Sequence, residues 1–134
     1  MKKHVVYICL AMFVAFGCQK PVKTDEIASD NGKKWLVNPE MALHFEAMEA
    51  EITNFKSGED IAMLQSRIKN NIAEVTATCT MKGQSHDELH KWLVPFIETV
   101  NAMQDQDPQA TIKNLSEQFK NYHLYFESAP QGTK

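Results

Sequence analysis

Four stretches of this chain each combine an apolar stripe at α-helical spacing with a signal that starts a helix. Asn38-Pro39 and Asp107-Pro108 each place a capping side chain before a proline, which is favoured at the first helical position. Ser85 is followed three residues later by Glu88, the spacing of a capping box. The run Ser57-Gly58-Glu59-Asp60 ends the first stretch and caps the second. Short connections join the stretches, as antiparallel neighbours require, so the sequence predicts an all-α, up-down-up-down antiparallel four-helix bundle. The predicted helices span residues 39–56, 59–79, 86–103 and 108–127.

The first 17 residues are predicted to be an export signal rather than part of the fold. A basic start, Met1-Lys2-Lys3-His4, is followed by an apolar stretch from Val5 to Phe16. This stretch is shorter than the roughly 20 apolar residues that a membrane-spanning helix needs. The pattern is therefore typical of a signal that is removed after export.

The end of this signal, Ala15-Phe16-Gly17-Cys18, resembles a bacterial lipobox, although Phe16 departs from the usual pattern. The resemblance implies cleavage before Cys18, lipid on that cysteine and attachment to a membrane of the cell envelope; an ordinary secretory signal cut elsewhere is the alternative. The start of the mature chain, Cys18-Gln19-Lys20, is similar to the surface-export signals of Bacteroidota lipoproteins, but acidic residues arrive only at Asp25-Glu26. The expected location is the periplasmic face or the outer-membrane surface.

The rest of the chain suits a single domain, because roughly 100 residues can bury one core. Without Lys2 and Lys3 the formal charge falls from −3 to −5, and no basic stripe is visible, which argues against a nucleic-acid partner. Cys9 lies in the predicted signal and Cys18 carries the predicted lipid, so Cys79 has no partner for an internal disulfide. The predicted parts are a signal peptide at 1–17, the lipidated cysteine and a flexible tether at 18–34, the bundle at 35–128 and a disordered tail at 129–134.

The histidines, methionines and remaining cysteine lie near the helix ends that such a bundle brings to one pole. His86 and His90 are four residues apart on one helix face, so both imidazoles can address one ion. Mixed nitrogen and sulfur donors suit Cu(I), and two histidines with a cysteine would satisfy Zn²⁺, so the sequence predicts a copper or zinc site. Asp87 and Tyr122 are candidates to orient the imidazoles. The predicted metal ligands are His86, His90, Cys79, His123, His44, Met48 and Met81.

The helical layout and the closing stretch from Asn121 to Phe126 also resemble cytochrome b562. That family holds haem b between a methionine early in its first helix and a histidine late in its fourth, so the resemblance implies ligation by His123 together with His44 or Met41. The local match is confined to the end of the fourth predicted helix. The chain lacks Cys-x-x-Cys-His, which excludes covalent c-type haem. A hemerythrin-like di-iron site would need more ligands on the second predicted helix, which offers Cys79 alone.

Each of these residues also has a purely structural interpretation. Methionines at helical spacing usually fill gaps in a core, and a free cysteine is a common small core residue. A buried histidine is more often hydrogen-bonded than bound to a metal. A further alternative is a non-catalytic module that docks another envelope protein through exposed Trp35 and Trp92. No set of nucleophile, base and orienting group is evident, so the sequence does not predict an enzyme.

Overall fold

The computed structural model describes residues 26–132, and the four predicted helices are present. The prediction of a mainly helical chain is therefore confirmed, and each predicted helix end lies within a few residues of the observed one. The predicted signal peptide, Cys18, the first part of the predicted tether and the last two residues of the predicted tail lie outside the described residues. The helices are α1 (Pro39–Asn54), α2 (Ile61–Thr78), α3 (Gln84–Ala102) and α4 (Pro108–Tyr125), with a short 3-10 helix η1 (Met103–Asp105) after α3.

Two of the predicted helix caps form. Asp60 Oδ1 accepts a hydrogen bond from the Ala62 amide at 2.8 Å, and Asp107 Oδ2 accepts one from the Ala110 amide at 2.8 Å. Pro108 is the first residue of α4. An N–H at this position has no partner within the helix, so proline loses no helical hydrogen bond there. These bonds satisfy amides that the first turn of a helix otherwise leaves without a partner.

The other two predicted caps are wrong. The Asn38 side chain does not cap α1; it donates to the Thr78 carbonyl at 3.1 Å and accepts from the Thr80 amide at 3.3 Å. It therefore joins the start of α1 to the end of α2. The capping box does not form either, because α3 already includes Ser85 and because Glu88 bonds to a different part of the chain.

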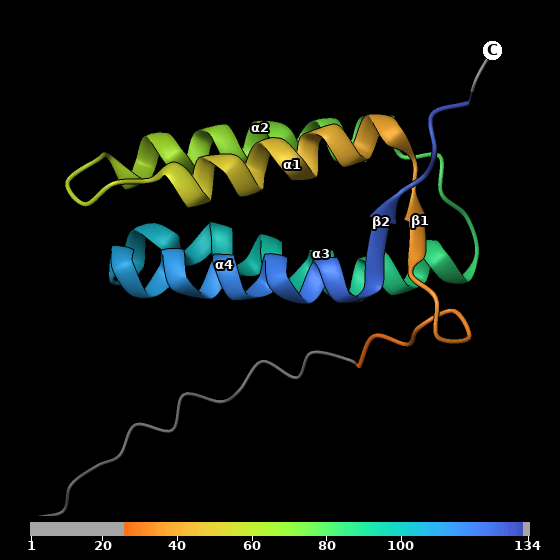
Figure 1. Ribbon diagram of the computed structural model, residues 1–134. Helices are drawn as coiled ribbons and strands as arrows, with labels where there is room; N and C mark the ends of the chain where they lie inside the picture. The colour runs from red at the N-terminus through yellow and green to blue at the C-terminus, as the bar shows by residue number, and fades with distance from the viewer. Residues whose placement is uncertain (1–25, 133–134) are drawn as a thin grey trace, which may run out of the picture.

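The four helices pack as two pairs around one core (Figure 1). α1 lies along α2, and α3 and α4 form the other pair. All four contribute fully buried side chains to the core, and Phe45, Leu64, Phe96 and Phe119 are each 1 % exposed or less. No helix in the described part of the chain is long and apolar enough to cross a membrane.

A small parallel sheet, which the all-α prediction missed, lies at one end of the helices (Figure 1). It consists of β1 (Trp35–Val37) and β2 (Phe126–Ser128), which directly precede α1 and follow α4. Trp35 is opposite Phe126 in the ladder, and the Ala129 amide extends it by donating to the Val37 carbonyl at 2.7 Å. The sheet therefore ties the two ends of the helical region together.

Trp92 lies at the centre of an aromatic cluster that joins α1, α3 and α4. Its indole nitrogen donates to the Gln118 carbonyl of α4 at 2.7 Å. Both tryptophans are buried, with Trp92 3 % and Trp35 9 % exposed, so the prediction that they are exposed docking anchors is wrong. The rings around Trp92 are Phe96, Tyr122, Phe119 and Phe45, with centroids 4.8, 5.1, 5.3 and 5.6 Å away.

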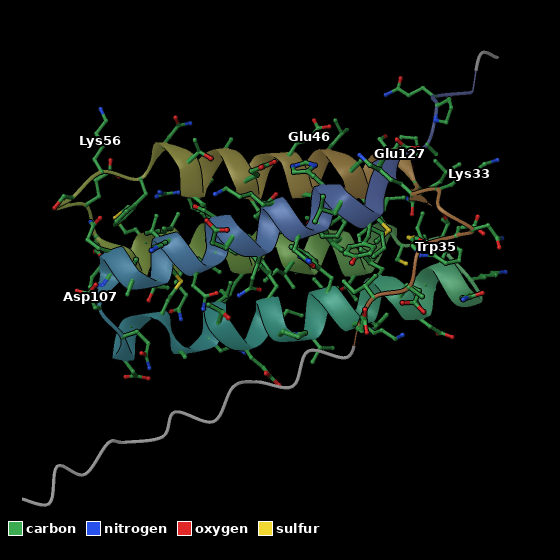
Figure 2. The ribbon with its side chains drawn as sticks, turned by 60° about the horizontal axis from the view of Figure 1, so that its bottom comes forward. Lys33, Trp35, Glu46, Lys56, Asp107 and Glu127 are labelled. Atoms are coloured by element: carbon green, nitrogen blue, oxygen red, sulfur yellow. The ribbon has the colours of Figure 1, made fainter. Side chains whose placement is uncertain are left out.

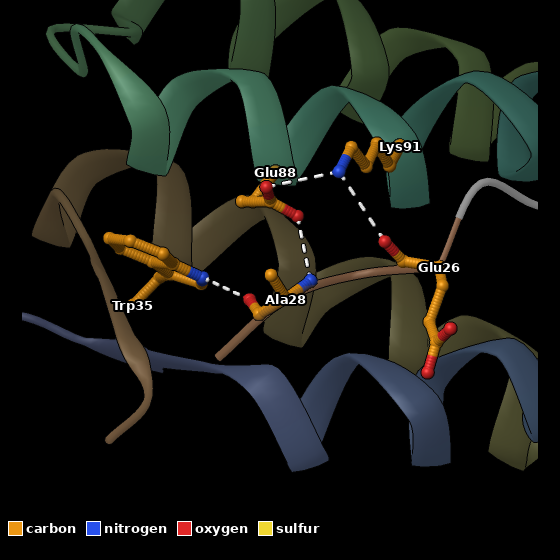
Figure 3. A network of polar contacts seen from close by, with 5 residues as sticks. All are labelled: Glu26, Ala28, Trp35, Glu88 and Lys91. Atoms are coloured by element: carbon orange, nitrogen blue, oxygen red, sulfur yellow. Dashed lines mark hydrogen bonds and ion pairs between the residues drawn. The ribbon is translucent and has the colours of Figure 1, made fainter. Parts of the chain in front are cut away.

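The segment that precedes β1 is held to α3, in contrast to the predicted flexible tether through residue 34 (Figure 3). Glu88, only 5 % exposed, accepts hydrogen bonds from the Ala28 amide at 2.9 Å and from the Lys91 ammonium at 3.0 Å. Lys91 also donates to the Glu26 carbonyl at 3.3 Å, and the Trp35 indole donates to the Ala28 carbonyl at 2.6 Å. We refer to these five residues as the N-terminal latch.

Candidate functional site

His86 and His90 lie one turn apart on α3, and their side chains meet. The two Nε2 atoms are 3.1 Å apart, and the ring centroids are 4.4 Å apart at an interplanar angle of 62°. A hydrogen bond at this distance requires one protonated and one bare Nε2. The His86 side chain is 37 % exposed and His90 is exposed, so the pair faces solvent.

The separation of these nitrogens suits a metal ion as well as a shared proton. Zinc with tetrahedral geometry and Zn–N bonds of about 2.0–2.1 Å holds two imidazole nitrogens about 3.3 Å apart. Square-planar Cu²⁺ holds them about 2.9 Å apart. The observed 3.1 Å lies between these values, so small side-chain rotations would admit either ion without movement of the helix. Asp87 Oδ1 is 3.9 Å from His86 Nδ1, on the side of the ring away from the pair.

The other two described histidines each bond to a different neighbour. His44 of α1 places Nδ1 3.0 Å from the side-chain oxygen of Asn71 on α2. His123 of α4 places Nε2 2.8 Å from a carboxylate oxygen of Glu49 on α1. His44 therefore lies at the boundary of α1 and α2, and His123 at the boundary of α1 and α4. Neither reaches the pair on α3.

The predicted sulfur ligands belong to the core. Met41 and Met48 are 1 % and 0 % exposed, and Cys79 and Met81 are partly buried against the same core. Within residues 26–132, no three His, Cys, Asp or Glu side chains are arranged to hold one ion. Of the seven predicted metal ligands, His86 and His90 are in direct contact, whereas His44 and His123 bond to Asn71 and Glu49.

The residues named for haem do not fit that group. Met41 is buried in the core, whereas His44 and His123 point to two different helix boundaries. The two axial ligands of a haem iron must face each other from opposite sides of the porphyrin plane. The interior between the helices is filled by the aromatic cluster around Trp92 instead.

The histidines miss the interior because each is next to a residue that takes the core position. Successive residues point about 100° apart around a helix, so only one of two neighbours can face fully inward. In the pairs His44 and Phe45, and Tyr122 and His123, the aromatic residue is buried and the histidine lies at the edge of the stripe. Leu89 is likewise buried, with 1 % exposure, whereas the next residue, His90, is exposed.

A pocket of about 200 Å³ lies between α1, α4 and β2, and we call it the α1–α4 pocket. Its floor is aromatic: the Tyr122 ring lies 4.9 Å from Phe45 and 5.3 Å from Phe126, nearly parallel to the latter. Figure 2 shows Glu46 on α1 and Glu127 on β2, two residues of its rim. The full rim consists of Lys34, Glu46, Glu49, His123, Glu127 and Ser128.

Tyr122 contributes a phenol to the lining of this pocket. Burial raises the pKa of Tyr122, and the negative charges of Glu46 and Glu49 raise it further. The phenol therefore stays protonated over the whole physiological range. The sequence analysis missed this pocket. The available signal was the position of Glu46 and Glu49 beside the small Ala42, which leaves space next to Phe45.

No family model matches the chain, and no curated protein or solved structure matches it either. Its function is therefore argued from its own residues and their geometry.

Proposed function

We propose that this protein binds a transition-metal ion, zinc or Cu²⁺, through His86 and His90 on α3. The observation that carries the proposal is the 3.1 Å separation of the two Nε2 atoms, which lies between the separations that bound zinc and bound Cu²⁺ require. Solvent can complete the coordination because the pair is at the surface. Borderline ions such as Zn²⁺ and Cu²⁺ accept two imidazoles and water, whereas Cu(I) would need the sulfur donors that lie in the core.

We further propose that the protein is held in the cell envelope by lipid on Cys18, with the helices in up-down-up-down antiparallel order. The lipobox-like Ala15-Phe16-Gly17-Cys18 supports the anchor. Seven residues lie between Cys18 and Glu26, where the N-terminal latch begins. A chain of that length reaches at most about 28 Å. An anchored domain would thus stay close to the membrane, with the metal site on the helix that carries the latch.

Replacing His86 and His90 together by alanine is expected to abolish stoichiometric binding of Zn²⁺ and Cu²⁺. Loss of a residue that only supports a ligand already lowers metal affinity about 10–100-fold, and these variants remove the ligands themselves. Each single variant should weaken binding by at least about tenfold. The measurement is calorimetric titration of the purified protein with each ion, together with elemental analysis of protein purified without chelator.

The matched control is His44→Ala, which removes an imidazole that bonds to Asn71 and should leave affinity unchanged. Helical circular dichroism should be the same in all variants because His86 and His90 face solvent. Unchanged affinity in the double variant would contradict the proposed site. Equal loss in the His44 control would show that the histidines act through the fold rather than as ligands.

A further inference from the structure

We propose that the α1–α4 pocket binds the ammonium group of an aliphatic amine. Its volume of about 200 Å³ is enough for an ammonium head and a short alkyl chain. The pocket does not include His86 or His90, so this proposal is independent of the metal site.

The aromatic floor is the first feature that favours a cation. Phe45, Phe126 and Tyr122 line the pocket, and with exposures of 1 %, 1 % and 5 % their rings are held in place by the core. The face of an aromatic ring carries partial negative charge and attracts a cation that lies over it. The alkyl part of an amine would contact the same rings, since their surface is otherwise apolar.

The charged rim is the second feature. It carries three carboxylates, Glu46, Glu49 and Glu127, and one ammonium, Lys34, so its formal charge is −2 while His123 is neutral. Of these three carboxylates, only that of Glu49 has an ion-pair partner within the described part of the chain, namely His123 at 2.8 Å. Glu46 and Glu127 therefore remain available to a cationic ligand.

The Tyr122 hydroxyl is the third feature. Its side chain is about nineteen-twentieths buried, and it lines the pocket. No hydrogen bond to the hydroxyl is present within residues 26–132, and its oxygen is not fully buried, so it is accessible from the pocket. An ammonium group can donate a hydrogen bond to the phenol oxygen.

Titration of the full chain with n-pentylammonium, followed by two-dimensional amide NMR, tests the proposal. We expect saturable shifts at pocket residues such as Ala42 and Ser128 and none at His86 and His90. n-Pentanol has the same alkyl chain without the charge and should bind at least about fivefold more weakly, because ion pairing and cation–π attraction are lost. Equal affinity for the alcohol, or no shifts at the pocket with the amine, would overturn the proposal.

The double variant Glu46→Gln with Glu127→Gln should weaken binding of n-pentylammonium about fivefold. The matched control is Glu74→Gln with Glu98→Gln, which removes the same charge from exposed positions on α2 and α3 and should leave affinity unchanged. Equal weakening in both double variants would mean that net charge, not the pocket, holds the amine, and would overturn the proposal.

A lysine side chain of another protein presents the same chemistry as a free amine. Nα-acetyl-lysine-methylamide, whose only free amine is the side chain, distinguishes the two sources. Affinity similar to that of n-pentylammonium would support the pocket as an acceptor of a partner's lysine. Exclusion of the lysine derivative, with retained binding of n-pentylammonium, would support a free amine as the ligand.

Discussion

Replacing Trp92 by alanine should lower the free energy of unfolding by about 3–5 kcal/mol, the range for loss of a large aromatic side chain from a core. Trp92 contacts rings of α1, α3 and α4, so its removal leaves a cavity where three helices meet. The Gln118 carbonyl would also lose its bond from the indole at 2.7 Å. Urea unfolding followed by far-ultraviolet circular dichroism measures the effect without relying on tryptophan fluorescence.

Two variants show whether this loss comes from the aromatic cluster. Trp92→Phe keeps a ring in the cluster and should cost about 1–2 kcal/mol, because the Gln118 carbonyl loses its partner and some volume is lost. Leu124→Ala removes a side chain that is 68 % exposed and should change stability by less than about 0.5 kcal/mol. If Trp92→Ala cost no more than Leu124→Ala, the cluster would not be the centre of the fold.

Replacing Glu88 by alanine should cost about 1–3 kcal/mol, because it removes the acceptor for the Ala28 amide and the partner of Lys91. Glu88→Gln keeps an oxygen for the Ala28 amide and loses only the charge, so it should cost less. The same variants should increase hydrogen exchange at the Ala28 amide, since the latch holds that segment to α3. Exchange at Ala28 that is unchanged in Glu88→Ala would show that the segment is held by other contacts.

The contribution of Glu88 should depend on pH. Burial raises the pKa of the Glu88 carboxyl, but the bonds from the Ala28 amide and the Lys91 ammonium lower it by more, so the pKa lies below the ordinary value of 4.5. The stabilisation is therefore present above about pH 4.5 and is lost as the pH falls through the lower, folded-state pKa. The stability difference between the native protein and Glu88→Gln should be constant near neutral pH and shrink below about pH 4.5. A difference that grew on acidification would contradict this role.

The helices could be predicted because their signals are local. Proline after Asn38 and after Asp107, and the acidic cap at Asp60, mark helix starts within the first turn. The strands could not be predicted in this way, because each has three residues and pairs with a segment at the other end of the domain. Glu88 was misassigned because its partner, the Ala28 amide, is 60 positions away.

For the candidate metal site, the sequence predicted contacts only between residues that share one helix. The spacing of His86 and His90 sufficed to bring their rings together. The directions in which the His44 and His123 side chains point depend on the exact rotation of α1 and α4 about their axes. The apolar stripe defines that rotation only to within one residue. The α1–α4 pocket combines residues from α1, α4 and the segments around the sheet, so no single stretch of sequence carries its pattern.

The parallel pairing of β1 and β2 determines how the domain bears mechanical load. The chain enters the two-stranded ribbon at Trp35 and leaves it at Ser128, which lie at opposite ends of the ladder. Tension between an anchor on the N-terminal side and a pull on the C-terminal side would therefore slide the strands past each other. The ladder bonds would be loaded together in shear rather than opened one after another, so the rate of forced unfolding is set by the rupture of the whole ladder.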